Sequence, residues 1–123
     1  MAAAEAPGLA LIVRRPPWHQ RAARADLDLA LAAMAMDIPL EVYFLGAALL
    51  QLARERDSRD ALLPPGYRAW ASLGDHAEVA VFAEQQWLDR CASRQIPLIL
   101  RPRPLSRVAM TERWRCCRHV VAA

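Results

Sequence analysis

The fold is decided by residues 9–44, which read LALIVRRPPWHQRAARADLDLALAAMAMDIPLEVYF. The stretch opens with a short apolar run at 9–13, continues with helix-forming residues at 22–36 and closes with a second apolar run at 40–44. The first run does not alternate with polar residues, which is typical of a strand that is covered on both faces of a parallel sheet. The stretch therefore predicts a right-handed βαβ unit. Ligands of such units bind beyond the carboxyl ends of the strands, so we expect the site near 14–20 and Gly46.

Length and composition indicate one globular domain. The chain has 123 residues, of which 55% are apolar and 24% are charged, and this is enough to bury a core. We expect residues 1–8 to form a flexible tail and residues 9–123 to form a single α/β domain. All 16 basic residues are arginine, which together with the many alanines suggests the coding bias of a GC-rich bacterium.

Charge, apolar runs and cysteines argue against several classes of protein. The net charge of +3 comes without a basic block or an RNA-binding aromatic motif, so direct nucleic-acid binding is not expected. We find no signal-peptide pattern and no apolar run of membrane-spanning length, so we expect a cytoplasmic protein. The three cysteines form neither a disulfide framework nor a metal-binding spacing. We expect no metal and no cofactor.

Apolar runs and helical patterns alternate along the rest of the chain. The predicted strands lie at 78–83, 97–100 and 119–122, and the predicted helices at 47–54, 67–73, 84–94 and after 106. The segment RPRP at 101–104 is too rich in proline for a helix or a central strand. Ser106 is placed to cap the last helix, with Leu105, Val108 and Ala109 on its inner side. Five strands that alternate with helices predict a three-layer α/β/α sandwich with a largely parallel five-stranded sheet.

An aromatic stripe marks the helix at 67–73. Tyr67, Trp70 and Leu73 recur at helical spacing, which predicts a core-facing side, and Gly74 is a plausible C-terminal cap.

The loop after the first strand is a candidate binding site. It contains no glycine between residues 14 and 20, which disfavours an ordinary dinucleotide-binding turn. Arg14, Arg15, Trp18 and His19 could still hold an anion at the start of the helix. The alternative is that both arginines face solvent and that Trp18 packs against a neighbour.

The cysteines divide into a core residue and an adjacent pair. Cys91 lies on the inner face of its predicted helix and should behave as a small apolar residue. Cys116 and Cys117 are flanked by Arg115 and Arg118, which would favour a thiolate. Adjacent cysteines bridge only through a strained ring, and this pair precedes the last strand, at the sheet end opposite to the expected site.

Taken in order, these features resemble the DsrE/DsrF-like sulfur-relay family, and within it the DsrF or TusC subunit type. The likeness rests on the first strand and its RRPP end, the helix at 22–31, LEVYFLG at 40–46 and the later strand-then-helix at 78–94. The resemblance implies a compact α/β subunit in a cytoplasmic hetero-oligomer of related chains that pass persulfide sulfur between cysteines. TusC-type assemblies serve thiolation of a tRNA wobble uridine, and DsrF-type assemblies serve sulfur oxidation.

The resemblance also implies where sulfur would be held. Sulfur-carrying members place the acceptor cysteine just after the third strand, where a helix amino terminus stabilises an anion. The matching stretch here is AVFAEQ at 80–85, which puts Ala83 at the carrier position and Glu84 next to it. A methyl group cannot carry sulfur. The candidate pocket therefore comprises Arg14, Arg15, Trp18, His19, Gly46, Ala83 and Glu84, with no catalytic residue.

Three functions are compatible with the sequence. The first is a non-catalytic subunit of a TusBCD- or DsrEFH-type sulfur-relay complex, with DsrE/TusD-like and DsrH/TusB-like partners. The second is an orphan homo-oligomeric module that binds a small anion. The third is a thiol-based sulfur carrier that uses Cys116 or Cys117. The first describes an accessory subunit and not an enzyme.

Overall fold

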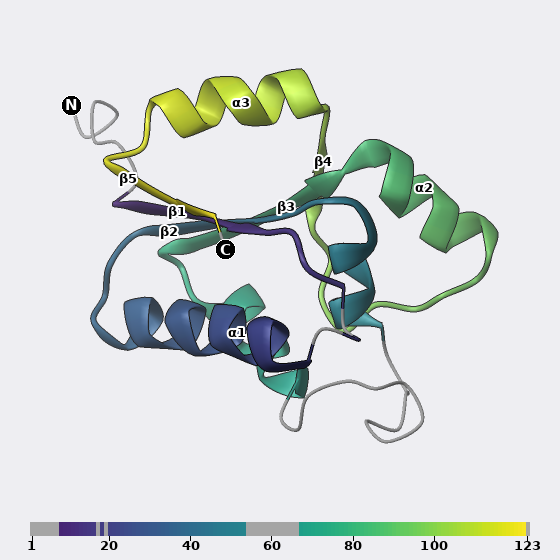
Figure 1. Ribbon diagram of the computed structural model, residues 1–123, viewed down its shortest axis with the longest axis horizontal. Helices are drawn as coiled ribbons and strands as arrows, with labels where there is room; N and C mark the ends of the chain where they lie inside the picture. Colours follow the sequence, from purple (N-terminus) through teal and green to yellow (C-terminus); the bar gives the residue numbers. More distant parts are fainter. Residues whose placement is uncertain (1–7, 17, 19, 54–66, 123) are drawn as a thin grey trace.

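Figure 1 shows the computed structural model, which describes residues 8–16, 18, 20–53 and 67–122. The strands are β1 (Leu9–Val13), β2 (Leu40–Phe44), β3 (Val79–Glu84), β4 (Arg103–Leu105) and β5 (His119–Ala122). The α-helices are α1 (Gln20–Ala35), α2 (Gln85–Ser93) and α3 (Arg107–Arg115), and the 3-10 helices are η2 (Gly46–Leu52) and η3 (Tyr67–Asp75). Of the expected tail at 1–8, all but Gly8 lies outside the described residues.

The five strands form one parallel sheet in the order β4-β3-β2-β1-β5. β1 pairs with β2 along its whole length, with Leu11 opposite Val42, and α1 connects the two strands. The predicted βαβ unit and the parallel five-stranded sheet are therefore confirmed. β1 lies between β2 and β5, so the last strand returns to the side of β1 opposite to β2.

Alternate residues of β1, β2 and β3 enter two separate cores on opposite faces of the sheet. With α3 above the sheet and α1 below it, this gives the three layers (Figure 1). The core below the sheet, against α1, η2, η3 and α2, includes Leu11, Val13, Leu27, Phe44, Leu49, Trp70, Leu73 and Cys91. The core above it, against α3, includes Ile12, Tyr43, Phe82 and Met110. Trp70 meets Phe44 edge to face, with ring centroids 5.1 Å apart, so the predicted core role of this tryptophan is confirmed.

The fourth strand lies at 103–105, and its prediction at 97–100 was wrong. Leu98 makes one antiparallel bridge with Ala53, and Ile99 N–H donates to Leu52 O at 2.7 Å, so this segment joins η2 and not the sheet. Its apolar side chains pack on the lower core, which explains their character. β4 accommodates Pro104 because it is an edge strand, where a missing N–H can face away from the neighbour.

Two details of the helices also differ from prediction. Ser106 caps α3, since its Oγ accepts a hydrogen bond from Ala109 N–H at 3.1 Å, as expected. Val108 however is 70% exposed, and Met110 is the fully buried residue of that helix. Gly74 lies within η3 and not after it, and a Cβ there would come within 2.7 Å of Leu100 Cδ1. This glycine therefore gives Leu100 room to pack.

Gly46 makes the corner after β2, with a φ of +56°. A side chain at this backbone conformation is strained by its own Cβ. Space is not the problem, because an added Cβ would lie 3.9 Å from the nearest atom, Trp87 Nε1. The predicted tight turn is confirmed.

We predict that Gly46→Ala lowers the free energy of unfolding by about 1 kcal/mol, because alanine is disfavoured at positive φ. Gly46→Asn should cost less, since asparagine tolerates this conformation better. Urea denaturation of the three proteins measures the difference. Equal stability of the alanine variant and the wild type would contradict the assigned backbone strain.

Candidate functional site

One carboxylate oxygen links the end of β3 to the residues that follow β2 and β4. Glu84 is the last residue of β3, and its Oε1 accepts a hydrogen bond from the Gly46 N–H at 2.8 Å. The same oxygen lies 3.1 Å from Nη2 of Arg107, the first residue of α3. The Glu84 side chain is 16% exposed and the Arg107 side chain 57%, so the ion pair opens to solvent on the arginine side.

The helices that follow β3 and β4, on either side of this carboxylate, lie on opposite faces of the sheet. α2 follows β3 and packs on the lower core, whereas α3 follows β4 and packs on the upper core. Helices that leave neighbouring strands towards opposite faces open a crevice at the carboxyl edge, which is where open α/β sheets bind ligands. Glu84 and Arg107 lie at that edge, so the candidate site is centred on them.

Ala83, the residue at the predicted carrier position, is closed to solvent. It is fully buried in the penultimate position of β3, and its strand neighbours are Phe44 on one side and Pro104 on the other. Its methyl group belongs to the lower core. The position lies near a strand end, as expected, but offers no reactive atom.

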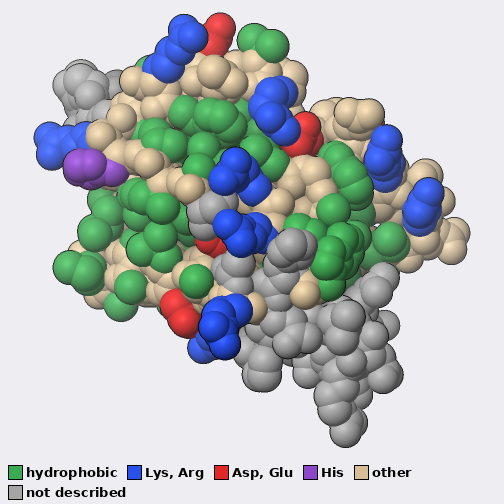
Figure 2. Space-filling view, viewed as in Figure 1, with side chains coloured by type: hydrophobic (Ala, Val, Ile, Leu, Met, Phe, Trp, Pro, Cys, Tyr) green, Lys and Arg blue, Asp and Glu red, His purple; other side chains and the backbone are tan. Residues whose placement is uncertain are grey.

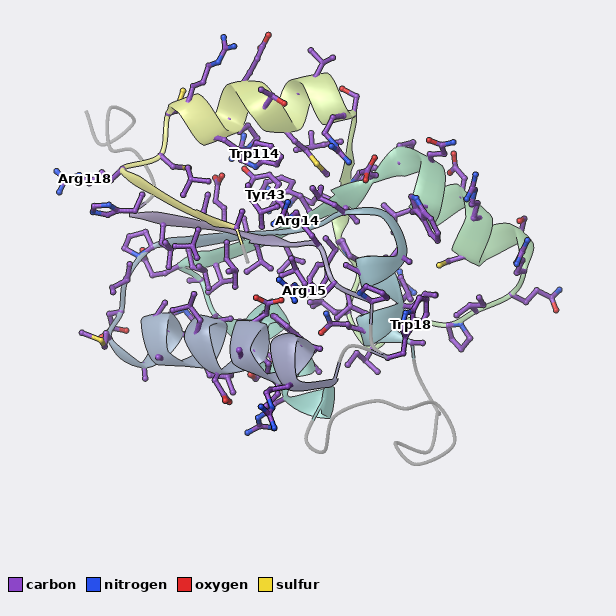
Figure 3. The ribbon with its side chains drawn as sticks, in the orientation of Figure 1. Arg14, Arg15, Trp18, Tyr43, Trp114 and Arg118 are labelled. Carbon is purple, nitrogen blue, oxygen red and sulfur yellow. The ribbon has the colours of Figure 1, made fainter. Side chains whose placement is uncertain are left out.

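The other residues of the predicted pocket do not converge on Glu84. Arg14, Arg15 and Trp18 are exposed, and the Trp18 side chain retains 52% of its surface. Figure 3 shows them apart, with Arg14 at the level of the sheet, Arg15 below it towards α1, and Trp18 further along. His19 lies outside the described residues. The structure thus brings Gly46 and Glu84 together and leaves the arginine loop as a separate feature.

Gln51 fixes the carboxyl end of β1 beside this loop. Its Nε2 donates to the main-chain oxygen of Arg15 at 2.8 Å, and its Oε1 accepts from Trp70 Nε1 at 3.3 Å. Gln51 is buried, so both of its bonds replace solvent contacts.

Asp26 is a buried acid near the same loop. It is 2% exposed, and its Oδ2 has no hydrogen-bond partner among the described residues. Burial raises the pKa of Asp26 to about 6, an effect that the nearby charges of Arg15 and Arg14 reduce but do not offset. The acid therefore changes its charge close to neutral pH.

A polar cluster lies on the other face, between β2 and α3. Glu41 is 6% exposed. Its carboxylate accepts a hydrogen bond from the Tyr43 hydroxyl and forms an ion pair with Arg113. Arg113 Nε also donates to the Tyr43 hydroxyl at 3.2 Å, and its guanidinium carbon lies 4.6 Å from the centre of the Phe82 ring. Figure 3 places Tyr43 in this layer, below Trp114 of α3.

The cluster determines the state of Cys117. Its Sγ lies 3.9 Å from Glu41 Oε1, and burial together with the Glu41 charge raises the pKa of the Cys117 thiol. The prediction that the flanking arginines favour a thiolate was therefore wrong for this residue. Figure 3 shows Arg118 extending away from the body of the molecule, and the arginine that faces Cys117 is Arg113.

Cys91 is buried on the inner face of α2, as predicted. Burial raises the pKa of its thiol. A shallow, mainly apolar groove of about 420 Å³ runs past it and is lined by Leu88, Cys91, Ala92, Ile96, Pro97, Leu98 and Arg101.

Within the described ranges no helix is long and apolar enough to cross a bilayer. Nor do three acidic, cysteine or histidine side chains gather there in a way that could hold a metal ion.

Comparison with known proteins decides the family. The family model described as DsrE/DsrF-like family matches residues 8–110. The chain belongs to the DsrE/DsrF-like family. The crystal structure of the ychN protein from E. coli has the same fold, with a TM-score of 0.73 over 94% of this chain and 98% of that one at 15% sequence identity. No curated protein sequence matches the chain.

Four polar residues of this DsrE/DsrF-like chain were not predicted from the sequence: Asp26, Glu41, Arg107 and Arg113. The first two interrupt apolar patterns, Asp26 among the inner positions of α1 and Glu41 as the second residue of LEVYF. An acid at a core position is a usable signal, because buried carboxylates are rare and need a partner. The arginines carried no local signal, since their partners lie 23 and 72 residues away.

We predict that Asp26→Asn raises stability at neutral pH. The native pKa of about 6 exceeds the ordinary 3.8, so the native state binds more protons between these values and stability falls as the pH rises through that range. The loss should amount to roughly 2–3 kcal/mol at pH 7. Urea denaturation from pH 4 to pH 7.5 should show this decline in the wild type and its absence in Asp26→Asn.

Asp28→Asn provides the matched control, because Asp28 is an exposed aspartate on the same helix that pairs with Arg24 at 3.0 Å. It should keep the wild-type pH dependence. If the wild type shows no decline above pH 4, the account of Asp26 is wrong.

Proposed function

We propose that the chain is a non-carrier subunit of a cytoplasmic sulfur-relay assembly. It would support persulfide transfer between related chains, for tRNA 2-thiouridine formation or for sulfur oxidation, without holding sulfur itself. Its expected partners are DsrE/TusD-like and DsrH/TusB-like subunits. The proposal joins the family of the chain to one observation, which is that Ala83, at the position where the resemblance implies the carrier cysteine, is buried and offers no reactive atom, while the neighbouring Glu84 holds a carboxylate.

The chemistry of the Glu84 region supports this role. A persulfide carrier needs an exposed cysteine whose anion is stabilised by nearby positive charge. Here Ala83 is buried, and Glu84 uses both the Gly46 N–H and the Arg107 guanidinium for its own carboxylate. A second anion would meet the negative charge of Glu84 first. The donors of an anion site are present, and the chain occupies them with its own side chain.

The adjacent cysteines are poorly suited to be the carrier. Burial and Glu41 hold the pKa of Cys117 above its ordinary value, so less of it is thiolate at neutral pH. Both cysteines lie between α3 and the start of β5, at the amino-terminal edge of the parallel sheet. That edge is opposite to Glu84. A thiol-based carrier at Cys116 or Cys117 is therefore the weaker hypothesis.

The small-anion module is also less favoured. Such a module needs cationic groups that converge on a free position, whereas the charges of Arg14 and Arg15 both act on the buried carboxyl group of Asp26. Arg107, the arginine at the carboxyl edge near Gly46, is already paired with Glu84.

We predict that incubation with a cysteine desulfurase and cysteine leaves the purified chain without a stoichiometric persulfide. Intact-mass spectrometry detects the added mass of a sulfur atom. The Cys116→Ser/Cys117→Ser double variant serves as the control and should take up as little sulfur as the wild type. Stoichiometric loading of the wild type that the double variant loses would establish a carrier and overturn the proposal.

The partner half of the proposal has its own test. Tagged chain purified from its native host and examined by native mass spectrometry should carry a related α/β chain that has a cysteine after its third strand. Purification without any such chain, under conditions that preserve other complexes, would contradict an assembly role.

A further inference from the structure

The side chain of Asp26 is buried on α1 without a charged partner in contact. The residue is 2% exposed, and its Oδ2 accepts no hydrogen bond among the described residues. Asp26 and Arg15 form no ion pair in the structure, which describes both residues. A buried carboxyl group in such surroundings is favoured in its neutral form. The structure therefore shows the arrangement that suits the protonated acid.

A cation is nevertheless close to this acid. Burial raises the pKa of Asp26 to about 6, and the charges of Arg15 and then Arg14, which follow β1, oppose that rise. Arg15 is exposed, and Figure 3 shows it below the sheet, towards α1. Buried charges in folded proteins are paired, so an ionised Asp26 requires a cation. The long and flexible side chain of Arg15 is placed to supply it.

The other charged groups around α1 are engaged or directed elsewhere. On α1 itself, Arg24 and Asp28 form an exposed ion pair with each other at 3.0 Å. α1 packs against β1, β2 and η3. β1 contains no charged residue, and Glu41 of β2 belongs to the cluster on the other face of the sheet. The remaining groups are exposed or have side chains outside the described residues: Asp75 at the end of η3 in the first case, His19 and Arg68 in the second.

The main chain of Arg15 is tied to the buried core. Its carbonyl oxygen accepts a hydrogen bond from Gln51 Nε2 at 2.8 Å, and Gln51 Oε1 accepts one from Trp70 Nε1 at 3.3 Å. Both Gln51 and Trp70 are buried, so water cannot readily replace either bond. A movement of Arg15 therefore changes the surroundings of the Trp70 indole N–H.

We propose that the proton on Asp26 sets the position of Arg15. When the acid is neutral, Arg15 stays exposed beside the carboxyl end of β1. When the acid is ionised, the guanidinium turns inward and forms an ion pair with Asp26. Ligands of open α/β sheets bind at this edge, so the switch withdraws one positive charge from the binding edge as the pH rises. The inference does not depend on the proposed relay role and can fail while that role stands.

An NMR titration from pH 4 to pH 7.5 tests the proposal. The carboxyl carbon of Asp26 reports its ionisation, and the Trp70 indole N–H reports the movement of Arg15. In the wild type both signals should change together, with a midpoint near pH 6 or slightly below it, because the ion pair favours the charged acid. In Asp26→Asn the Trp70 signal should stay constant over this range.

Arg15→Gln removes the cation but keeps the main-chain oxygen that Gln51 binds. In this variant the midpoint of Asp26 ionisation should rise by about one pH unit, and the response of Trp70 should disappear. Arg21→Gln, which alters an exposed arginine in the first turn of α1, is the matched control and should titrate as the wild type does. His19→Gln removes the histidine that could titrate in the same range and should also leave the response in place.

Three results would overturn the proposal. In the first, Asp26 of the wild type ionises without a change at Trp70, as a buried acid with no effect on the loop would do. In the second, the midpoint in Arg15→Gln equals that of the wild type. In the third, the Trp70 response survives in Asp26→Asn or is lost in His19→Gln, so that another group controls it.

Discussion

At the carboxyl edge of the sheet, one oxygen atom, Glu84 Oε1, holds three segments together, because it contacts both the Gly46 N–H and the Arg107 guanidinium. These groups lie at or just after the ends of β2, β3 and β4, which are distant in sequence and adjacent in the sheet. A parallel sheet brings the carboxyl ends of its strands to one edge, where their loops must be held by side chains because they lack ladder partners. In this chain a carboxylate performs that task, directly after Ala83, which is buried in the lower core.

The three buried or half-buried acids show how environment assigns a role to a carboxylate. The Glu84 side chain is 16% exposed and paired with Arg107. Glu41 is buried and fully engaged by Arg113 and Tyr43, so it anchors α3 to the sheet. Asp26 is equally buried, and one of its oxygens has no partner in the described part of the chain. Burial raises the pKa of this carboxyl group. Unpaired burial costs stability, whereas paired burial fixes geometry.

The sequence predicted those features that depend on local pattern. The core position of Cys91 and the cap at Ser106 each follow from spacing within a dozen residues, and the βαβ opening follows from three consecutive runs within residues 9–44. The fourth strand was placed at 97–100 because periodicity cannot separate an apolar segment that pairs from one that only packs. Local sequence pattern does not predict strand order either. The partnership of Glu84 and Arg107 could be seen only once β4 lay next to β3.

The claim that Glu84 occupies an anion position is tested most directly by titrating the chain with thiosulfate and following the Gly46 amide by NMR. In Glu84→Ala the amide signal should move to saturation as the anion takes the place of the carboxylate, and the additional change Arg107→Ala should abolish that movement. In the wild type the signal should stay where it is. A wild-type amide that responds to thiosulfate as strongly as that of Glu84→Ala would show that the carboxylate does not hold the site.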